Sequence, residues 1–183
     1  MGPRLRHHPR PLAPMLLQAR GTRTLGFLLF VLFLSPTLSA QQEQADQIII
    51  VKSQHTLTLL SHGKPIKVYK VALGTVSSGP KEHQGDHKTP EGKYIIDAKN
   101  LNSRFHLALH VSYPKAADKA HAKAQGLPPG GDIMIHGVEK KYEYLGSLQH
   151  NYDWTDGCIA LTNPEIEEVS RLVPIGTPVE IKP

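Results

Sequence analysis

The single cysteine of this chain, Cys158, and a histidine earlier in the sequence, His136, are the two side chains best suited to nucleophilic chemistry. A histidine beside a cysteine takes the thiol proton and produces the thiolate, the form of sulfur that attacks carbonyl carbons. A lone cysteine also fits packing in a core or a disulfide to another chain. The pair therefore indicates thiol acyl chemistry, with these two ordinary explanations still open.

The residues next to the two side chains favour reactivity. Gly157 allows a sharp turn before the cysteine, and that turn could present main-chain N–H groups to a developing oxyanion. Asp156 could orient an imidazole or bind a substrate amine, although an Asp-Gly pair is often only a turn. His136 ends a short apolar segment and precedes Gly137, so its side chain is expected at a strand edge.

The order of the two residues along the chain excludes several families of cysteine enzymes. Papain-like proteases place the cysteine before the histidine, and caspases have a different motif around the cysteine. Sortases share the order found here, but with a wider gap and an arginine further downstream. The sequence matches none of these three patterns.

The segments that must position these residues read mainly as short strands. Apolar runs and alternating patterns predict strands at 48–51, 56–59, 66–73, 92–97, 105–111 and 178–181. Two helices are expected, one within 114–125 and one from Asn163, taken as the N-cap, to about Leu172. The stretch 74–92 is rich in Gly, Ser, Pro, His and Lys and predicts a long surface loop. The expected fold class is mainly β (α+β), with two or three peripheral helices.

The first 40 residues read as a secretory signal peptide rather than as part of the fold. Five arginines and no acidic residue precede the apolar run 25–38, and Ala40 then offers a cleavage point. The run is shorter than the roughly 20 residues of a spanning helix, so membrane contact is expected only through the export signal. A periplasmic or cell-envelope protein is predicted, with signal peptide 1–40 and one domain, 41–183. Met15 offers an alternative start.

The mature part of the chain carries no formal net charge. All 16 acidic residues lie after residue 40, and the five signal arginines leave the same number of Lys and Arg there. The basic pI therefore belongs mainly to the signal. Nucleic acid is not expected as a partner.

The two motifs together resemble the L,D-transpeptidase catalytic domain, the YkuD family of bacterial wall enzymes. That family has a His-Gly strand end followed by Ser/Thr-x-Gly-Cys, and here His136-Gly137 is followed by 155–158 (TDGC). The segment 85–92 (GDHKTPEG) is similar to a Thr-Pro-x-Gly loop of the family, and the ending 175–181 is similar as well. The resemblance spans about 47–182 and implies a single β-sandwich domain with peripheral helices.

Carried over by position, the resemblance implies that Cys158 is the nucleophile and His136 its general base and acid. Gly157 and the cysteine would lend N–H groups to the oxyanion hole, Thr155 would shape the loop, and Tyr113 would line the groove. The implied donor is a tetrapeptide stem of peptidoglycan, which loses its terminal D-Ala as a thioester forms. No metal and no organic cofactor is implied.

The sequence departs from the family at two positions. Asp156 and Ala160 stand where the family commonly has His and Arg. The loss of a guanidinium removes a bidentate partner for carboxylates, so donor recognition is expected to differ. The form Thr-Asp-Gly-Cys-Ile-Ala resembles a branch that includes enzymes detaching proteins from the wall by hydrolysis. The acyl acceptor therefore stays open between a stem amine, a lysine of a wall-linked lipoprotein, and water, and a non-catalytic peptidoglycan-binding module is the alternative from another class.

Two pairs of histidines have the spacing of metal ligands. His83 and His87 are four residues apart, as are His106 and His110. This spacing brings ligands together on a helix, whereas the first pair is expected in a loop and the second on a strand. No metal site is therefore predicted. The second pair is instead expected on the open face of its strand, where it could border the substrate groove.

Overall fold

The computed structural model describes residues 43–183. The expected signal peptide and its cleavage point lie outside the described residues. Eight strands form one sheet, in the order β3-β2-β1-β8-β4-β5-β6-β7. Their bounds are β1 Gln47–Val51, β2 Thr56–Ser61, β3 Lys64–Lys70, β4 Gly92–Ser103, β5 His106–Val111, β6 Met134–His136, β7 Ile159–Ala160 and β8 Pro178–Lys182. The mainly β fold expected from the alternating patterns is confirmed.

The long strand β4 joins the two halves of this sheet and lets it curl. Its first part, from Gly92, pairs with β8, and its second part, from Ile96, pairs with β5. The far ends of the sheet then meet, because Ala72, just after β3, exchanges two main-chain hydrogen bonds with Ala160 of β7 at 3.1 and 2.8 Å. The curl brings the cysteine segment against the chain that follows the first hairpin.

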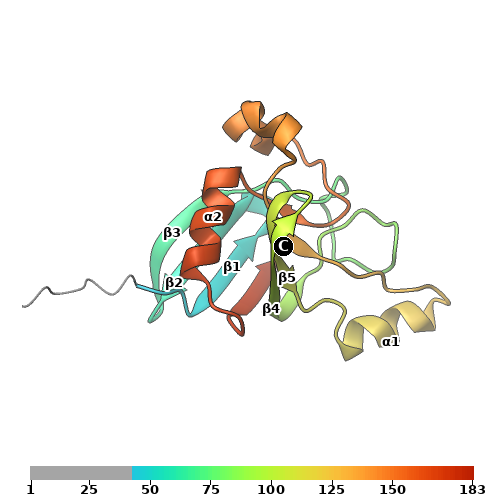
Figure 1. Ribbon diagram of the computed structural model, residues 1–183. Helices are drawn as coiled ribbons and strands as arrows, with labels where there is room; N and C mark the ends of the chain where they lie inside the picture. Colours follow the sequence, from blue (N-terminus) through green and yellow to red (C-terminus); the bar gives the residue numbers. More distant parts are fainter. Residues whose placement is uncertain (1–42) are drawn as a thin grey trace, which may run out of the picture. The chain divides into compact units, whose positions relative to one another are not determined.

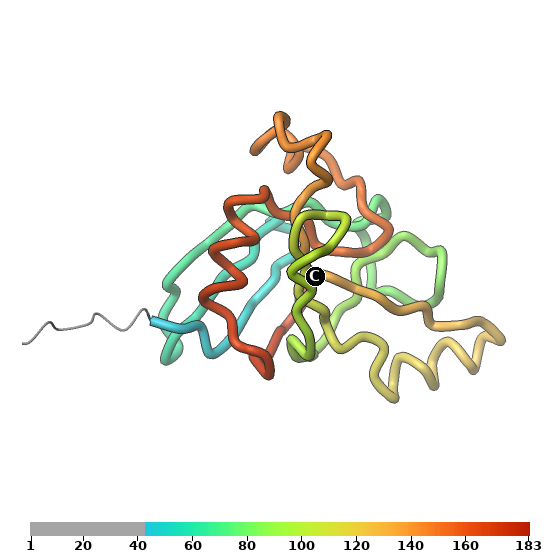
Figure 2. Tube along the Cα trace, in the orientation of Figure 1, coloured from blue at the N-terminus to red at the C-terminus, as the bar shows by residue number. Residues whose placement is uncertain are grey.

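Two α-helices and two 3-10 segments flank the sheet: α1 (Ala116–Ala124), α2 (Asn163–Leu172), η1 (Lys52–Gln54) and η2 (Lys140–Asn151). Figure 1 shows α2 lying across β1, β2 and β3, with α1 further out at the lower right and the orange segment η2 at the top of the view. The trace in Figure 2 shows that the chain after α1 returns to the sheet as an extended segment. The helices at α1 and α2 were expected from the sequence, whereas η2 was not.

The start of α2 differs by one residue from the sequence expectation. Thr162, rather than Asn163, is the N-cap, and it forms a capping box with Glu165. The side chain of Asn163 is used elsewhere, because its Oδ1 accepts a hydrogen bond from the N–H of Val138 at 2.8 Å. This contact ties the start of α2 to the segment that follows β6.

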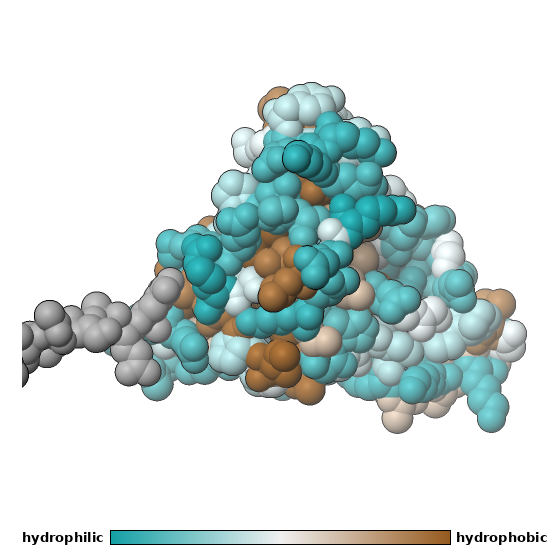
Figure 3. All heavy atoms as spheres, in the orientation of Figure 1, coloured by the Kyte–Doolittle hydropathy of each residue, from teal (hydrophilic) through white to brown (hydrophobic). Residues whose placement is uncertain are grey.

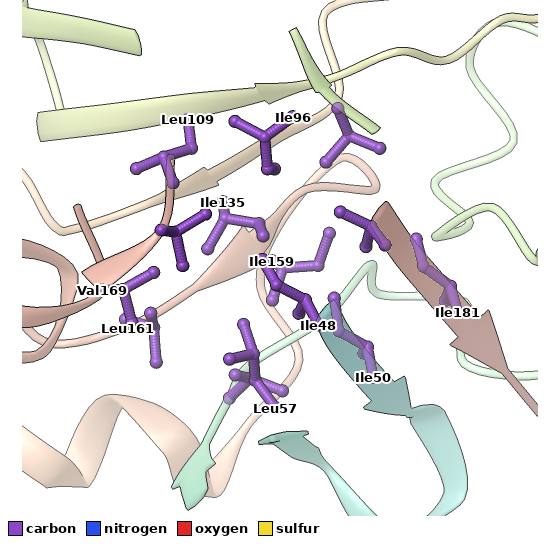
Figure 4. Packing of buried hydrophobic residues seen from close by; sticks show 14 of the residues in the cluster. Ile48, Ile50, Leu57, Ile96, Leu109, Ile135, Ile159, Leu161, Val169 and Ile181 are labelled. Atoms are coloured by element: carbon purple, nitrogen blue, oxygen red, sulfur yellow. The ribbon is translucent and has the colours of Figure 1, made fainter. Parts of the chain in front are cut away.

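The apolar core lies between α2 and the inner face of the curled sheet. Figure 4 shows Ile135 of β6 and Ile159 of β7 packed among residues from β1, β4, β5 and α2. Both isoleucines are fully buried, and such burial contributes roughly 1.5–3 kcal/mol for each side chain. Successive residues of a strand point to opposite faces, so His136 and Met134 point away from the core when Ile135 points into it.

The surface is mostly hydrophilic on the face shown in Figure 3, with smaller hydrophobic patches between the polar residues. The strand β3 at one end of the sheet exposes Lys64, Lys67 and Lys70, and such charges discourage pairing with another sheet edge. No helix within residues 43–183 combines the length and the apolar character that a membrane crossing requires.

Candidate active site

The structure places Cys158 and His136 on neighbouring strands. The strands β6 and β7 are parallel, with His136 opposite Ala160, and the cysteine lies just before β7. The N–H of Met134 donates to Sγ of Cys158 at 3.4 Å, which sets the sulfur beside the face of β6 that carries the histidine. Both side chains line one cavity of about 890 Å³. The pairing of these two strands therefore brings together the two residues that the sequence singled out.

His136 is held as a neutral base. Its Nδ1 lies 2.6 Å from the carbonyl oxygen of Gly137, and because a carbonyl only accepts, Nδ1 carries the hydrogen and Nε2 keeps a lone pair. The side chain is 3% exposed, with the ring of Phe105 at 4.5 Å and that of Trp154 at 5.8 Å between centroids. Burial lowers the pKa of His136, although the hydrogen bond to Gly137 acts in the opposite direction.

Cys158 is held as a protonated thiol. Burial raises its pKa, the carboxylates of Asp156 and Asp132 add to the rise, and the N–H of Met134 opposes it. The Sγ also lies 3.5 Å from the carbonyl oxygen of Asp132, a position in which the thiol donates. The thiolate therefore forms only when a base removes the proton, and the Met134 N–H then points at the charge.

The loop before the cysteine is fixed by Thr155. Its hydroxyl accepts the N–H of Gly157 at 3.1 Å and donates to the carbonyl oxygen of Cys158 at 2.8 Å. Through this hydroxyl, the two hydrogen bonds join Gly157 and Cys158 to the start of the turn. Of the two N–H groups expected at an oxyanion hole, that of Gly157 is occupied by the hydroxyl, whereas that of Cys158 makes no hydrogen bond to the described part of the chain.

Two glycines at the site allow close packing of main chains. A Cβ on Gly157 would lie 2.5 Å from the carbonyl oxygen of Lys88, and φ at this glycine is +122°. A Cβ on Gly137 would lie 2.4 Å from Oδ1 of Asn163. The first glycine lets the loop 74–91 lie against the cysteine turn, and the second lets α2 start beside β6.

Tyr113 does not line the cavity that holds the cysteine, contrary to the sequence expectation. Its side chain is 2% exposed, and its hydroxyl donates to the carbonyl oxygen of Pro129 at 2.9 Å. The ring also packs against Tyr94, at 6.0 Å between centroids. Tyr113 therefore supports the segment 128–132 through its contact with Pro129, and that segment lines a second cavity.

The second cavity, of about 640 Å³, adjoins the cysteine turn at Asp156. It shares Asp156 with the first cavity and is also lined by His87 and by Asp132, whose carbonyl oxygen contacts Sγ. Asp156 contacts the imidazole of His87, with Nδ1 and Oδ1 2.8 Å apart. The loop was expected at 74–92 and ends at residue 91, where β4 follows, and it is part of the site.

Several side chains of the first cavity were not singled out from the sequence. Phe105 and Trp154 enclose the histidine, and Arg104 lies over the Phe105 ring at 4.7 Å while its Nε contacts Glu139 at 3.3 Å. The alternating pattern of 105–111 marks Phe105 as inward-facing, which is the one signal that the sequence offers. The segment η2 also supplies Tyr142 and Leu145 to the cavity wall, and their place between His136 and Cys158 in the sequence fits a cap over the site as well as ordinary packing.

The two histidines of β5 each contact a carboxylate on a neighbouring element. His106 contacts Glu167 of α2 and His110 contacts Asp97 of β4, and neither lines the cavity of the cysteine. The expectation that they border the groove is therefore not met. Within residues 43–183, no group of three or more His, Cys, Asp or Glu side chains is arranged to hold a metal ion.

Comparison with known proteins identifies the family of this fold and site. Residues 45–181 match the L,D-transpeptidase catalytic domain, YkuD. The chain belongs to the L,D-transpeptidase family. This family assignment confirms the resemblance seen in the His-Gly and Thr-x-Gly-Cys motifs.

Relatives of this L,D-transpeptidase domain include YafK of Escherichia coli strain K12, a proposed L,D-transpeptidase, at 32% identity over 76% of this chain and 54% of YafK. The helical cell shape determining protein Pgp2 of Campylobacter jejuni is 26% identical, with a TM-score of 0.57 over 76% of this chain and 48% of Pgp2. The L,D-transpeptidase of Mycobacterium smegmatis shares the fold at 16% identity, with a TM-score of 0.50 over 76% of this chain and 59% of that one. The chain spans about half the length of the curated relatives that it matches.

Proposed function

We propose that the protein is an exported cysteine acyltransferase of the cell envelope that acts on peptidoglycan stem peptides. The observation that carries this proposal is that Cys158 and His136 lie on paired strands and face one cavity in a domain of the L,D-transpeptidase family. The likeness to Pgp2, named as a determinant of helical cell shape, supports a role in wall remodelling.

The geometry supports a defined acylation step. Nε2 of His136 removes the thiol proton, Sγ of Cys158 attacks the carbonyl carbon of the stem's diamino acid, and the amine of the terminal residue leaves with the proton from the imidazole. The N–H of Cys158, which makes no hydrogen bond within residues 43–183, supplies an oxyanion donor. The Met134 N–H stabilises the thiolate between these events.

The walls of the first cavity suit a peptide with carboxylates. Phe105 and Trp154 provide apolar surface, and Arg104 presents a guanidinium to the same cavity. This arginine supports donor recognition in place of the one that the family commonly has at position 160, where Ala160 is fully buried. Its Nε is already held by Glu139, which leaves the two terminal amino groups for a bidentate carboxylate.

The test of the proposal is covalent labelling. Purified protein is incubated with a tetrapeptide muropeptide or a carbapenem, and the intact mass is measured for wild type and for Cys158→Ala. An adduct on wild type that is absent from Cys158→Ala supports the assignment. If neither protein gains mass and neither alters the muropeptide, while both still bind isolated sacculi, the domain is a peptidoglycan-binding module instead.

The fate of the acyl group is tested separately. Sacculi are incubated with the protein with and without an added amine, and the products are separated by mass. Products that contain the amine support transfer to a stem or protein amine. Products that end in a free carboxylate under both conditions support a hydrolase, which trims stems or detaches a wall-linked protein.

A further inference from the structure

A second histidine and carboxylate pair stands beside the cysteine and has no part in the acylation step above. Nδ1 of His87 lies 2.8 Å from Oδ1 of Asp156, across 69 residues of sequence. An ionised carboxylate only accepts, so Nδ1 of His87 carries a hydrogen, and in the neutral form of the ring Nε2 keeps its lone pair. The hydrogen bond from Nδ1 to this carboxylate sets the tautomer of the neutral ring, with Nε2 free to accept a proton.

The pair occupies the boundary between the two cavities. Asp156 lines both of them, His87 lines the second, and the Sγ of Cys158 is reached from the first. His87 is about half exposed, whereas His136 is 3% exposed. A group that takes a proton from an incoming water or amine must pass it to solvent in each turnover. The exposed imidazole suits that task better than the buried one.

The loop that carries His87 is held by a buried ion pair and by hydrogen bonds to its main chain. Asp86, next to it, is buried with Lys81 in an ion pair at 2.7 Å, and its carboxylate also accepts three main-chain N–H groups. Burying such a pair carries a desolvation cost that only good geometry offsets. His87 itself has φ of +54°, a left-handed conformation that is strained for a residue with a side chain.

The carbonyl groups of His87 and Lys88 also pack closely against two glycines, one after the first hairpin and one in the cysteine turn. A Cβ on Gly74 would lie 2.2 Å from the carbonyl oxygen of His87, and one on Gly157 would lie 2.5 Å from that of Lys88. These approaches leave no space for the loop to shift inward. The main chain of His87 is therefore positioned by the fold, whereas the carboxylate that its imidazole contacts, on Asp156, is 92% exposed.

We infer that His87, oriented by Asp156, is the general base that activates the acyl acceptor entering through the second cavity. The inference rests on the proposed function, since it concerns the second half of the same reaction. In this step the acceptor oxygen or nitrogen attacks the thioester carbonyl carbon and gives a proton to Nε2 of His87. The C–S bond breaks, and the sulfur leaves as the thiolate of Cys158. His87 then loses its proton to solvent, and the thiolate takes one up.

The experiment separates acylation from deacylation in His87→Gln. Wild type and variant are mixed with a tetrapeptide muropeptide, the reaction is quenched at intervals, and released terminal residue and protein mass are measured together. General bases contribute about 100- to 10,000-fold. We expect the first turnover of His87→Gln within about threefold of wild type, steady-state turnover reduced at least about 100-fold, and acyl-enzyme accumulating.

Two further variants make the test specific. Asp156→Asn keeps a hydrogen-bonding side chain but removes the charge, and it is expected to change deacylation in the same direction by a smaller factor. His110→Gln removes an imidazole that is likewise paired with a carboxylate, Asp97, but outside the cavity of the cysteine. It is expected to leave both steps unchanged. Hydroxylamine, which attacks thioesters without a base, is expected to restore turnover in His87→Gln.

The outcomes distinguish the two proposals. Equal slowing of the first turnover and of the steady state in His87→Gln would overturn the inference, because it would show that His87 only supports the loop. Unchanged kinetics in that variant would overturn it as well and leave the proposed function intact. A wild-type protein that forms no acyl-enzyme and releases no residue would overturn the proposed function and, with it, the role of His87.

Discussion

The ring of Phe105 lies 4.5 Å from the ring of His136, tilted by 32°, and closes one side of the imidazole from water. With Trp154 on another side, this contact is a main source of the burial that lowers the pKa of His136. Because the base must be neutral to take the thiol proton, the enclosure keeps it functional in mildly acidic solution.

The first prediction is a pH profile. The pKa of His136 is below its ordinary value of about 6.5, so the rate of adduct formation with a carbapenem should hold down to pH 6.5 and fall only below it. Phe105→Ala should move this acidic limb to higher pH, since the imidazole becomes more exposed, whereas Phe105→Leu should leave it nearly in place. Intact mass measured against time at each pH gives the rates. An acidic limb that is the same in all three proteins would contradict the role of Phe105.

The second prediction concerns the loop hydroxyl. Thr155→Val removes both hydrogen bonds that hold the Gly157 N–H and the Cys158 carbonyl, while the shape of the side chain is kept. Small displacements of reacting groups cost roughly 100-fold in rate, so we expect a loss of that size in acylation. Thr155→Ser keeps the hydroxyl and should react at close to the wild-type rate. Similar rates for the valine and serine variants would show that the hydroxyl has no such part.

The third prediction compares two glycines that both lie outside the left-handed region. A Cβ at Gly137 would overlap Oδ1 of Asn163 at 2.4 Å, whereas a Cβ at Gly131 would meet only Pro114, at 3.9 Å. Gly137→Ala should lower the free energy of unfolding by about 2 kcal/mol through overpacking. Gly131→Ala should stay within about 0.5 kcal/mol of wild type. Urea denaturation of both variants is the measurement, and equal stabilities would contradict the packing argument.

The fourth prediction concerns the buried ion pair under the loop 74–91. Burial alone would raise the pKa of Asp86, but hydrogen bonds from Lys81 and from three main-chain N–H groups lower it to about 2. A carboxyl with a depressed pKa stabilises the fold above its unfolded value of 3.8, and this contribution is lost as the pH falls toward 2.

Asp86→Asn leaves Lys81 buried without a countercharge, so we expect a loss of about 3 kcal/mol in the free energy of unfolding at pH 7. The variant should also show a weaker dependence of stability on pH between 4 and 2. Lys67→Met, which removes an exposed partner of Glu168, serves as the control and should change stability by less than about 1 kcal/mol. A pH dependence that is unchanged in Asp86→Asn would contradict the assignment.

The sequence predicted the strands better than the walls of the site. Alternation and apolar runs depend on burial of one face, so the strands of the first hairpin, β5 and β8 were found close to their observed bounds. The strand β7 was missed because two residues are too few to show a period. The segment η2 was missed because its 3-10 turns are mostly polar, and the contact that holds its end, from Trp154 to Gln149 at 3.1 Å, joins two side chains that no sequence pattern pairs.

The candidate nucleophile and base were visible because their motifs are local. Thr155, Gly157 and Cys158 are consecutive or nearly so, and a turn explains their contacts. The pair of His87 and Asp156 was not visible, since only the curl of the sheet brings the loop 74–91 to the cysteine turn. The prediction for Tyr113 was wrong because a tyrosine near a loop is equally compatible with a groove wall and with the core. Its burial follows from its contacts with Tyr94 and with the carbonyl oxygen of Pro129.

The meeting of the two sheet ends at Ala72 and Ala160 has a consequence for local opening. Four main-chain hydrogen bonds join 72–75 to 155–160, so the cysteine segment cannot detach unless the closed sheet also comes apart. Amide protons of Thr155 and Ala160 should therefore exchange with deuterium only as slowly as the core strands, whereas those of η2 should exchange early. The candidate nucleophile would then belong to the last part of the domain to unfold, while one wall of its cavity opens freely.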